Sequence, residues 1–218
     1  WIWDTRVPQF VPKIGSAKAI NLSNKRVLMI GTDMAAGKMT VGLELYSYLK
    51  EKQINAGFVA TGQVGITVTG KGIPLDAYKL DHACGAVESA VMEQKDKDIV
   101  IVEGQGSILH PGSTATLPLM RGTCPTHMIL CHIARNDSLR SLENIKIPDL
   151  KKFIKLNEEL ATVIGTYPDT KVIGIALNTI LMTDEAAKEY MKKTEEETGL
   201  PVTDVVRYGG DKIFSQLI

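Results

Sequence analysis

The chain has 218 residues, a formal net charge of zero and 44% hydrophobic residues. This length and composition predict one sizeable α/β domain with a single core. Neutrality gives no reason to expect a nucleic acid or an anionic membrane as partner, and no apolar run approaches the roughly 20 residues of a membrane span. The cysteines lack C-x-x-C spacing, which favours a reduced, cytoplasmic protein over a disulfide framework or structural zinc.

The opening segment 1–24 contains Pro8, Pro12 and Gly15 and is typical of a linker. Because the first residue is Trp rather than Met, we expect the chain to be a piece of a longer or processed polypeptide. The sequence thus predicts a linker over 1–24, following an N-terminal domain of the same protein, and a second domain over 25–218.

Apolar, β-rich runs alternate with helical patterns after this segment. Strands are predicted over Val27–Ile30, Gly57–Thr61, Ile99–Glu103, His127–Cys131, Val172–Leu177 and Val202–Val206. Helices are predicted over Lys38–Lys52, Ala77–Gln94, Leu150–Ile164, Asp184–Thr198 and Asp211–Gln216. This alternation predicts a three-layer α/β sandwich with a mainly parallel sheet, whose ligands bind beyond the carboxyl ends of the strands.

The run GTDMAAGKMT follows the first predicted strand and precedes a helix, which is the order of a P-loop. In such a loop, backbone N–H groups and the helix N-terminus converge on an anion, and the lysine adds a positive charge. The alternative is a plain glycine turn with a solvated lysine. The fold expected is therefore P-loop NTPase-like, and the predicted phosphate-binding residues are Gly31, Thr32, Asp33, Ala35, Ala36, Gly37, Lys38, Met39 and Thr40.

The loop departs from the pattern G-x-x-x-x-G-K-[ST] at two positions. Thr32 replaces the first glycine, and Met39 replaces the residue whose hydroxyl normally binds Mg²⁺. These departures argue against a conventional Mg-ATP geometry. Thr40 stays a candidate phosphate or metal ligand, together with Asp33 and Glu103.

The run EGQGS follows the predicted strand 99–103 and ends at the same sheet edge. A carboxylate there can hold Mg²⁺ directly or through water, and we take Glu103 as a candidate metal ligand and acid–base group. Gln105 is a candidate substrate contact, and His110 follows within reach. The alternative is a tight turn with an exposed glutamate.

Several further polar residues are candidates for substrate or base binding. Thr61 and Gln63 offer neutral contacts after the second strand. Asp81 shares a helix face with Glu88, so the two can orient an amine or a metal; the alternative is a solvated face. Asn178 ends a late strand and can contact a purine edge or cap a turn.

Two weaker candidates come from the middle of the chain. Arg121 can pair with a phosphate or carboxylate, and a surface salt bridge is equally compatible. His132, at a strand end, is a candidate acid or base or else a structural histidine. The catalytic candidates are thus Lys38, Glu103, His110 and His132.

These motifs resemble those of a known family. The GTD and GK residues resemble the P-loop of dethiobiotin synthetase, E-G-x-G its second magnesium-site motif, and Asn178 its adenine-side asparagine. The whole set is closer to a P-loop family that joins a Rossmann-like N-terminal domain to a dethiobiotin-synthetase-like C-terminal domain. GTD-x-x-x-GKMT, TGQ-x-G, EGQGS-x-x-HP, LMRG and LCH look like its recurrent motifs, and the resemblance runs from about Val7 to the C-terminus.

Some members of that family are D-glutamate N-acetyltransferases that use acetyl-CoA. The resemblance therefore implies an acyltransferase, in which the P-loop holds the phosphates of CoA. The alternative is a ligase or NTPase that uses ATP and Mg²⁺, and a third possibility is a nucleotide-sensing domain without turnover. The expected partners are a small-molecule substrate, the N-terminal domain and a second copy of the chain.

Overall fold

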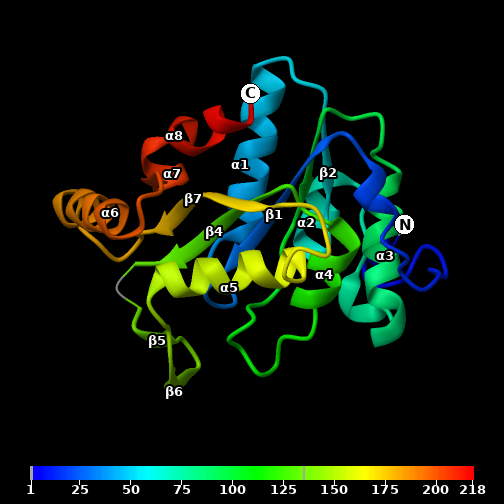
Figure 1. The fold of residues 1–218 in the computed structure, drawn as a ribbon, viewed down its shortest axis with the longest axis horizontal. Helices are drawn as coiled ribbons and strands as arrows, with labels where there is room; N and C mark the ends of the chain where they lie inside the picture. Colours follow the sequence, from blue (N-terminus) through cyan, green and yellow to red (C-terminus); the bar gives the residue numbers. More distant parts are fainter. Residues whose placement is uncertain (1, 135) are drawn as a thin grey trace.

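A parallel β-sheet forms the centre of the computed structural model, which describes residues 2–134 and 136–218 (Figure 1). The six strands follow the order β2-β3-β1-β4-β7-β8, so β1 lies between β3 and β4. Every neighbouring pair is parallel, so all carboxyl ends meet at one edge. The strands are β1 (Lys25–Gly31), β2 (Ala56–Val59), β3 (Ile99–Val102), β4 (His127–Ile133), β7 (Lys171–Asn178) and β8 (Val202–Thr203).

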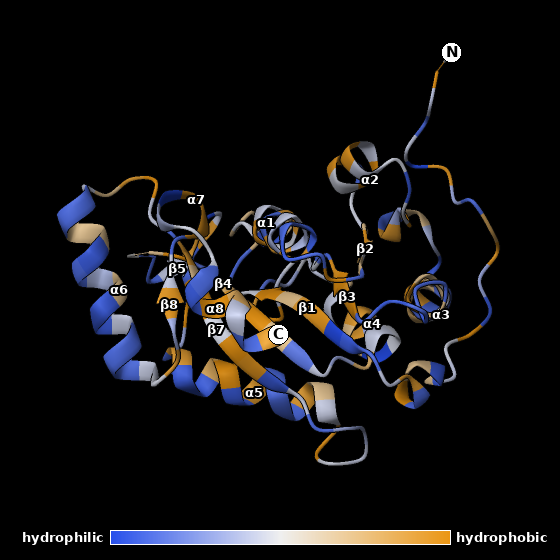
Figure 2. Cartoon of the chain, turned by 90° about the horizontal axis from the view of Figure 1, so that it is seen from above, coloured by the Kyte–Doolittle hydropathy of each residue, from blue (hydrophilic) through white to orange (hydrophobic). Residues whose placement is uncertain are grey.

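Helices cover both faces of the sheet because its strands are apolar on both sides. Val27 and Met29 of β1 belong to the core packed with α1 and α8, whereas the alternating Leu28 and Ile30 belong to the core packed with α3, α4 and α5. Figure 2 shows α1 and α7 on one side and α5 on the other. The helices are α1 (Lys38–Glu51), α2 (Gln63–Thr69), α3 (Leu80–Met92), α4 (Thr116–Thr123), α5 (Leu150–Thr162), α6 (Asp184–Thr198), α7 (Val205–Tyr208) and α8 (Asp211–Phe214), with short 3-10 turns η1 (Lys18–Asn21), η2 (Leu75–Ala77) and η3 (Ser215–Leu217).

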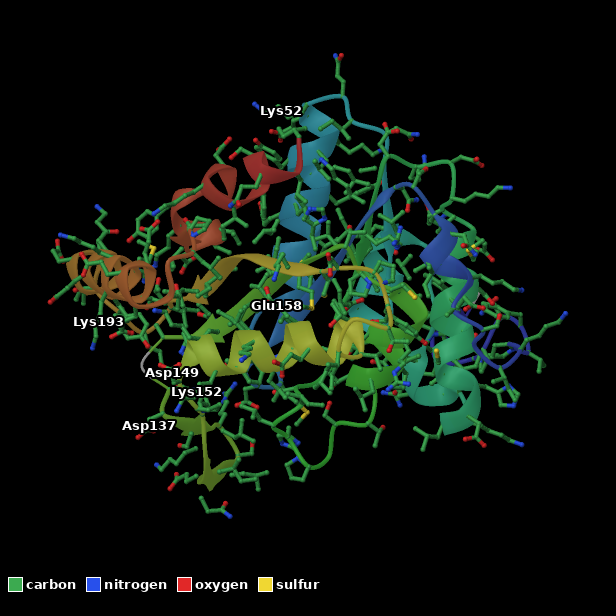
Figure 3. The ribbon with its side chains drawn as sticks, viewed as in Figure 1. Lys52, Asp137, Asp149, Lys152, Glu158 and Lys193 are labelled. Carbon is green, nitrogen blue, oxygen red and sulfur yellow. The ribbon has the colours of Figure 1, made fainter. Side chains whose placement is uncertain are left out.

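These layers confirm the predicted three-layer α/β fold. Helix α5 is fixed by polar contacts as well as by its apolar face. Asp149 caps it by accepting a hydrogen bond from the N–H of Lys152 at 3.0 Å. Glu158 lies beside β7 in Figure 3 and accepts a hydrogen bond from the N–H of Val172 at 2.9 Å. The helix thereby holds the strand whose last residue is Asn178.

The predicted strands match the observed ones closely except for the last. The predicted strand 202–206 was too long, because β8 ends at Thr203. The Asp204 side chain accepts hydrogen bonds from the N–H groups of Val206 and Arg207 at 3.1 and 3.2 Å and so starts α7. A helical turn, rather than a strand, therefore lies at the ligand-binding edge.

Besides α7, two further helices and a hairpin have no counterpart among the predicted elements. Helix α2 contains a glycine and β-branched residues, which have low helix propensity, and α4 contains Pro118 in its first turn. The hairpin consists of β5 (Ser138–Leu139) and β6 (Leu142–Lys146). The observed helix α3 is shorter than the predicted helix 77–94, because the chain is extended at Tyr78 before α3 begins. Among the described residues, no helix has both the length and the apolarity needed to cross a membrane.

The N-terminal segment, for which the sequence predicts a linker, lies against α3. The buried Glu88 carboxylate accepts hydrogen bonds from the N–H groups of Ser16 and Lys18 at 3.0 and 2.8 Å. The Nδ1 atom of His82 lies 2.8 Å from the carbonyl oxygen of Pro12. Residues 12–18 therefore pack on the domain. The domain boundary between residues 24 and 25 stays a prediction.

Candidate functional site

The loop between β1 and α1 has the geometry of an anion-binding loop. Gly37, the N-cap of α1, has a φ of 107°, a conformation that favours glycine. Within the described residues, the backbone N–H groups of Ala35, Ala36 and Gly37 donate to no protein acceptor. These free donors and the N-terminus of α1 fit a phosphate group.

Lys38 is a buried cation at the start of α1. Only 6% of its surface is exposed, and its Nζ atom donates to the main-chain oxygen of Asp33 at 2.8 Å. In the described part of the chain, no carboxylate forms an ion pair with it. Burial lowers the pKa of Lys38, and the nearby carboxylates of Asp33 and Glu103 oppose this shift. Because Lys38 is buried, the alternative of a solvated lysine is wrong. A bound anion would supply the missing counter-charge.

The carboxylate of Asp33 connects the loop to the β5–β6 hairpin. Its Oδ1 atom accepts a hydrogen bond from the N–H of Met34 at 2.6 Å, and Oδ2 accepts one from the N–H of Arg140 at 2.7 Å. Arg140 lies in the turn of the hairpin. Asp33 therefore orders the loop, and its predicted role as a metal ligand stays a prediction.

Glu103 is buried at the carboxyl end of β3, with 3% of its surface exposed. Its Oε2 atom accepts hydrogen bonds from the N–H groups of Thr61 and Gly62 at 2.9 and 3.2 Å, and Oε1 accepts one from Gln105 Nε2 at 3.2 Å. Burial raises the pKa of Glu103, while these hydrogen bonds and Lys38 oppose the shift. The alternative of an exposed glutamate in a turn is therefore wrong.

His132 lies beneath the loop. Its Nδ1 atom is 2.9 Å from the hydroxyl oxygen of Thr32, and burial lowers the pKa of His132 to about 4, so the ring is neutral at pH 7. Ser107 donates from its hydroxyl to the main-chain oxygen of Thr32 at 2.9 Å. The two residues fix Thr32 from two sides, which indicates a positioning role.

A polar cavity of about 360 Å³ opens on one side of the loop. Inside it, Gln63 Nε2 donates to the carboxylate of Asp76 at 2.8 Å. Thr61 and Gln105 also line the cavity, and both bond to Glu103, which lies behind them. Its walls include Met34, Thr61, Gln63, Asp76, Gln105 and Ser113.

A mostly aliphatic pocket of about 190 Å³ lies on the other side of the loop. Gly37 and Thr40 form one wall, and Asn178 and residues of α7 form another. Helices α1 and α7 contact each other and lie side by side in Figures 1 and 2. Asn178 accepts a hydrogen bond from the N–H of Ile180 at 3.2 Å, so it shapes the turn and still lines the pocket.

Two predicted contact residues are not brought to the loop. Arg121 is exposed in the last turn of α4, which leads to the amino end of β4. Asp81 is exposed beside Leu80, which lines the polar cavity, but Asp81 itself does not line it. Glu88 was interpreted as ligand-binding or solvated; both interpretations are wrong, because it is buried against the N-terminal segment.

His110 lies in the loop that follows β3. Its Nδ1 atom accepts a hydrogen bond from the N–H of Gly112 at 3.1 Å, and Gly112 lines the polar cavity. His110 therefore lies near the cavity. Among the described residues, it forms no hydrogen bond with Glu103. Its predicted acid–base role stays a prediction.

Sequence reasoning missed several residues of this edge. Ser107 lies within EGQGS and so had a positional signal, whereas Asp76 lies in η2, beyond α2, and had none. Asp204 is buried and accepts hydrogen bonds from the N–H and hydroxyl of Thr179 at 3.0 and 2.6 Å. A charged residue inside a predicted strand was the available signal for Asp204 and, with it, for Arg207.

The residues predicted to bind a metal make other contacts in the structure. Among the residues described, no group of three or more His, Cys, Asp and Glu side chains is arranged to hold a metal ion. The carboxylates of Glu103 and Asp33 are both engaged by N–H groups, whereas Thr40 lines the aliphatic pocket. The magnesium site stays a prediction.

The sequence matches the model of a known protein family over both the sheet and the P-loop. Residues 13–214 match the P-loop domain of the DUF1611 family, described as a domain of unknown function. The chain belongs to this family. A crystal structure of a DUF1611 family protein from Anabaena variabilis superposes with a TM-score of 0.96 and 45% identity, over 99% of this chain and 63% of that one.

Two curated relatives carry the name D-glutamate N-acetyltransferase. The protein from Pseudoalteromonas sp is 34% identical over 93% of this chain and 60% of its own length. The protein from Tritonibacter scottomollicae is also 34% identical, over 98% of this chain and 63% of its own length. The chain thus spans less than two thirds of both relatives.

A more distant structure shares the fold. A nucleotide-binding protein in complex with ADP from Archaeoglobus fulgidus has a TM-score of 0.51 at 12% identity, over 82% of this chain and 79% of that one. At this identity the likeness shows a P-loop fold and no more.

Proposed function

We propose that this domain binds acetyl-CoA at its P-loop and transfers the acetyl group to the amino group of an amino acid such as D-glutamate. One observation carries the proposal: the anion-binding loop lies between an aliphatic pocket and a polar cavity. CoA has a nucleoside, a diphosphate and a long arm that ends in the thiol, in the same order. The names of the two curated relatives support the reaction.

The residues of the loop fit a diphosphate that needs no metal. Lys38 lacks a protein counter-ion among the described residues, and free N–H groups precede it. Met39 stands where a magnesium-binding hydroxyl is usual. Lys38 and the backbone would therefore neutralise the diphosphate by themselves.

Glu103 is the residue we assign to proton removal. Bound acetyl-CoA would supply an acetyl thioester, whose C–S bond breaks as the new C–N bond forms, so that CoA leaves as a thiolate and takes up the proton lost by the amine. The acceptor must attack as a free amine, and a carboxylate whose pKa is raised by burial is a suitable base near neutral pH. Glu103 lies behind Thr61 and Gln105 of the polar cavity, where the amine would bind. His110 is the alternative base. His132 is disfavoured as a base, because burial lowers its pKa to about 4.

The test is calorimetric titration of the full-length protein with acetyl-CoA, and separately with ATP with and without Mg²⁺. Acetyl transfer to D-glutamate and L-glutamate is then measured. We expect metal-independent binding of acetyl-CoA and transfer to an amino acid. Absence of acetyl-CoA binding, together with tight binding of ATP that requires Mg²⁺, would overturn the proposal.

That opposite result would support the second candidate, an ATP-dependent ligase resembling dethiobiotin synthetase. One observation favours it: Glu103 directly follows β3, which pairs with the P-loop strand β1. A carboxylate in that place suits a magnesium ion. The ligase would phosphorylate a substrate carboxylate in the polar cavity.

We also propose that the working enzyme includes more than this domain. The chain covers about 60% of the curated relatives, which leaves room for the Rossmann-like N-terminal domain implied by the resemblance. A second subunit is the other expected partner. Light scattering and activity of the full-length protein, compared with residues 1–218 alone, test both.

A further inference from the structure

Helix α7 brings one cation to the mouth of the aliphatic pocket. Among the described residues that line this pocket, Arg207 carries the only positive side chain. It is exposed, and its Nη2 atom donates to the main-chain oxygen of Met182 at 2.9 Å. This bond holds the side chain in place, and a guanidinium has further N–H groups that can donate to a ligand.

The guanidinium of Arg207 is not held in an ion pair by the protein residues described, although the Asp184 carboxylate and the Tyr208 hydroxyl lie close enough to feel its charge. Within this part of the chain, no carboxylate forms an ion pair with its guanidinium. The buried Asp204 accepts the backbone N–H of Arg207, and its other oxygen accepts two hydrogen bonds from Thr179. Asp204 therefore holds α7 in place, while the guanidinium is available to an anion.

The position of Arg207 relative to the loop decides which anion it can reach. Under the proposed function the loop and Lys38 would hold the diphosphate, and the aliphatic pocket, which Asn178 lines, would hold the nucleoside. Arg207 lies at this same nucleoside pocket, away from the polar cavity. CoA carries a phosphate on its ribose at the 3′ position, whereas ATP and ADP have a free hydroxyl there.

We propose that Arg207 binds the 3′-phosphate of CoA and thereby makes the domain prefer CoA over ATP. Arginine suits this role, because its planar guanidinium forms two parallel hydrogen bonds with a phosphate. The inference rests on the proposed function, since it concerns the same ligand. It adds the residue that distinguishes CoA from other adenine nucleotides.

The experiment compares two ligands that differ by this phosphate alone. Affinities of the full-length protein for CoA and for 3′-dephospho-CoA are measured by calorimetry, in the unchanged protein and in Arg207→Gln, Arg207→Lys and Arg6→Gln. Arg6 is an exposed arginine in the N-terminal segment and serves as the matched control. Thermal unfolding checks that each variant is folded.

We expect the unchanged protein to bind CoA about tenfold or more tightly than 3′-dephospho-CoA, a value typical of a charge-assisted contact. Arg207→Gln should remove this preference and leave the affinity for 3′-dephospho-CoA unchanged. Arg207→Lys should keep part of it, and Arg6→Gln all of it. The preference should also decrease with salt, because the site is exposed.

Equal affinities for the two ligands in the unchanged protein would overturn the inference while leaving CoA binding intact. Equal weakening of both ligands in Arg207→Gln would also overturn it, and would assign Arg207 to the shape of the pocket. Failure to bind either ligand, with binding of ATP instead, would overturn the proposed function and the inference with it.

Discussion

Each end of strand β1 has a buried cation nearby that lacks a carboxylate partner among the described residues, and the two cations differ in how fully they are hydrogen-bonded. Arg26, at the amino end, is 1% exposed, and Lys38, beyond the carboxyl end, is 6% exposed. Burial lowers the pKa of both. The Nε and Nη1 atoms of Arg26 donate to oxygens of Leu22, Asn24, Thr123 and Cys124 at 2.8 to 3.1 Å.

Lys38 makes a single hydrogen bond to a protein oxygen among the described residues. An ammonium has three donors, so Lys38 keeps two for a ligand, whereas Nε and Nη1 of Arg26 are both bonded to protein oxygens. Burial alone therefore does not distinguish a structural cation from a functional one. The number of protein acceptors does.

The comparison is tested most strongly by Lys38→Met. We expect CoA to bind about hundredfold more weakly, because a charged hydrogen-bond donor to the phosphate is lost. The free energy of unfolding should stay equal or increase, because an unpaired buried charge is removed. Calorimetry and urea unfolding measure the two effects. Lower stability with unchanged CoA affinity would mean that Lys38 is structural.

Arg26→Met should show the opposite pattern. We expect the free energy of unfolding to fall by about 3 kcal/mol, because several buried oxygens lose their donor. The affinity of the folded protein for CoA should not change. Urea unfolding measures the first effect and calorimetry the second, with Arg6→Met as control. A variant that is fully stable would contradict the structural role.

Glu103→Gln tests the carboxylate near Lys38, whose negative charge opposes the downward shift of the Lys38 pKa. If Glu103 is the base, acetyl transfer should fall about hundredfold, with CoA binding retained. In the unchanged enzyme the rate should fall as the pH drops through a pKa above the usual range of glutamic acid, because only the deprotonated form accepts a proton. This acid limb should vanish in the variant; full activity would exclude the role.

Ser107→Ala should have the smallest effect. The main-chain oxygen of Thr32 would lose one donor, so we expect about 1 kcal/mol less stability and a few-fold weaker binding of CoA. Ser138→Ala, which removes an exposed hydroxyl from the hairpin, is the matched control. An identical response of the two variants in both stability and affinity would show that Ser107 does not position the loop.

Much of the candidate site could be predicted from the sequence because its residues directly follow strands. Lys38, Thr61, Glu103 and Asn178 all lie at one edge, as parallel strands require. Arg121 and Asp81 were less predictable, because a helical position does not say which end of the sheet a side chain reaches. The structure leaves both exposed, outside the two lined cavities.

By itself, the sequence determined the parallel sheet, the P-loop and the order of the main elements, because apolar periodicity and a glycine-flanked lysine are local signals. Only the tertiary structure decided that Glu103 is buried, that His132 supports Thr32, and that Arg207 lines the aliphatic pocket. These facts depend on contacts between residues 40 to 170 positions apart, for which a single sequence carries no local pattern. Short elements such as α2, α4 and α7 were decided in the same way, since packing and capping outweigh their weak helix propensity.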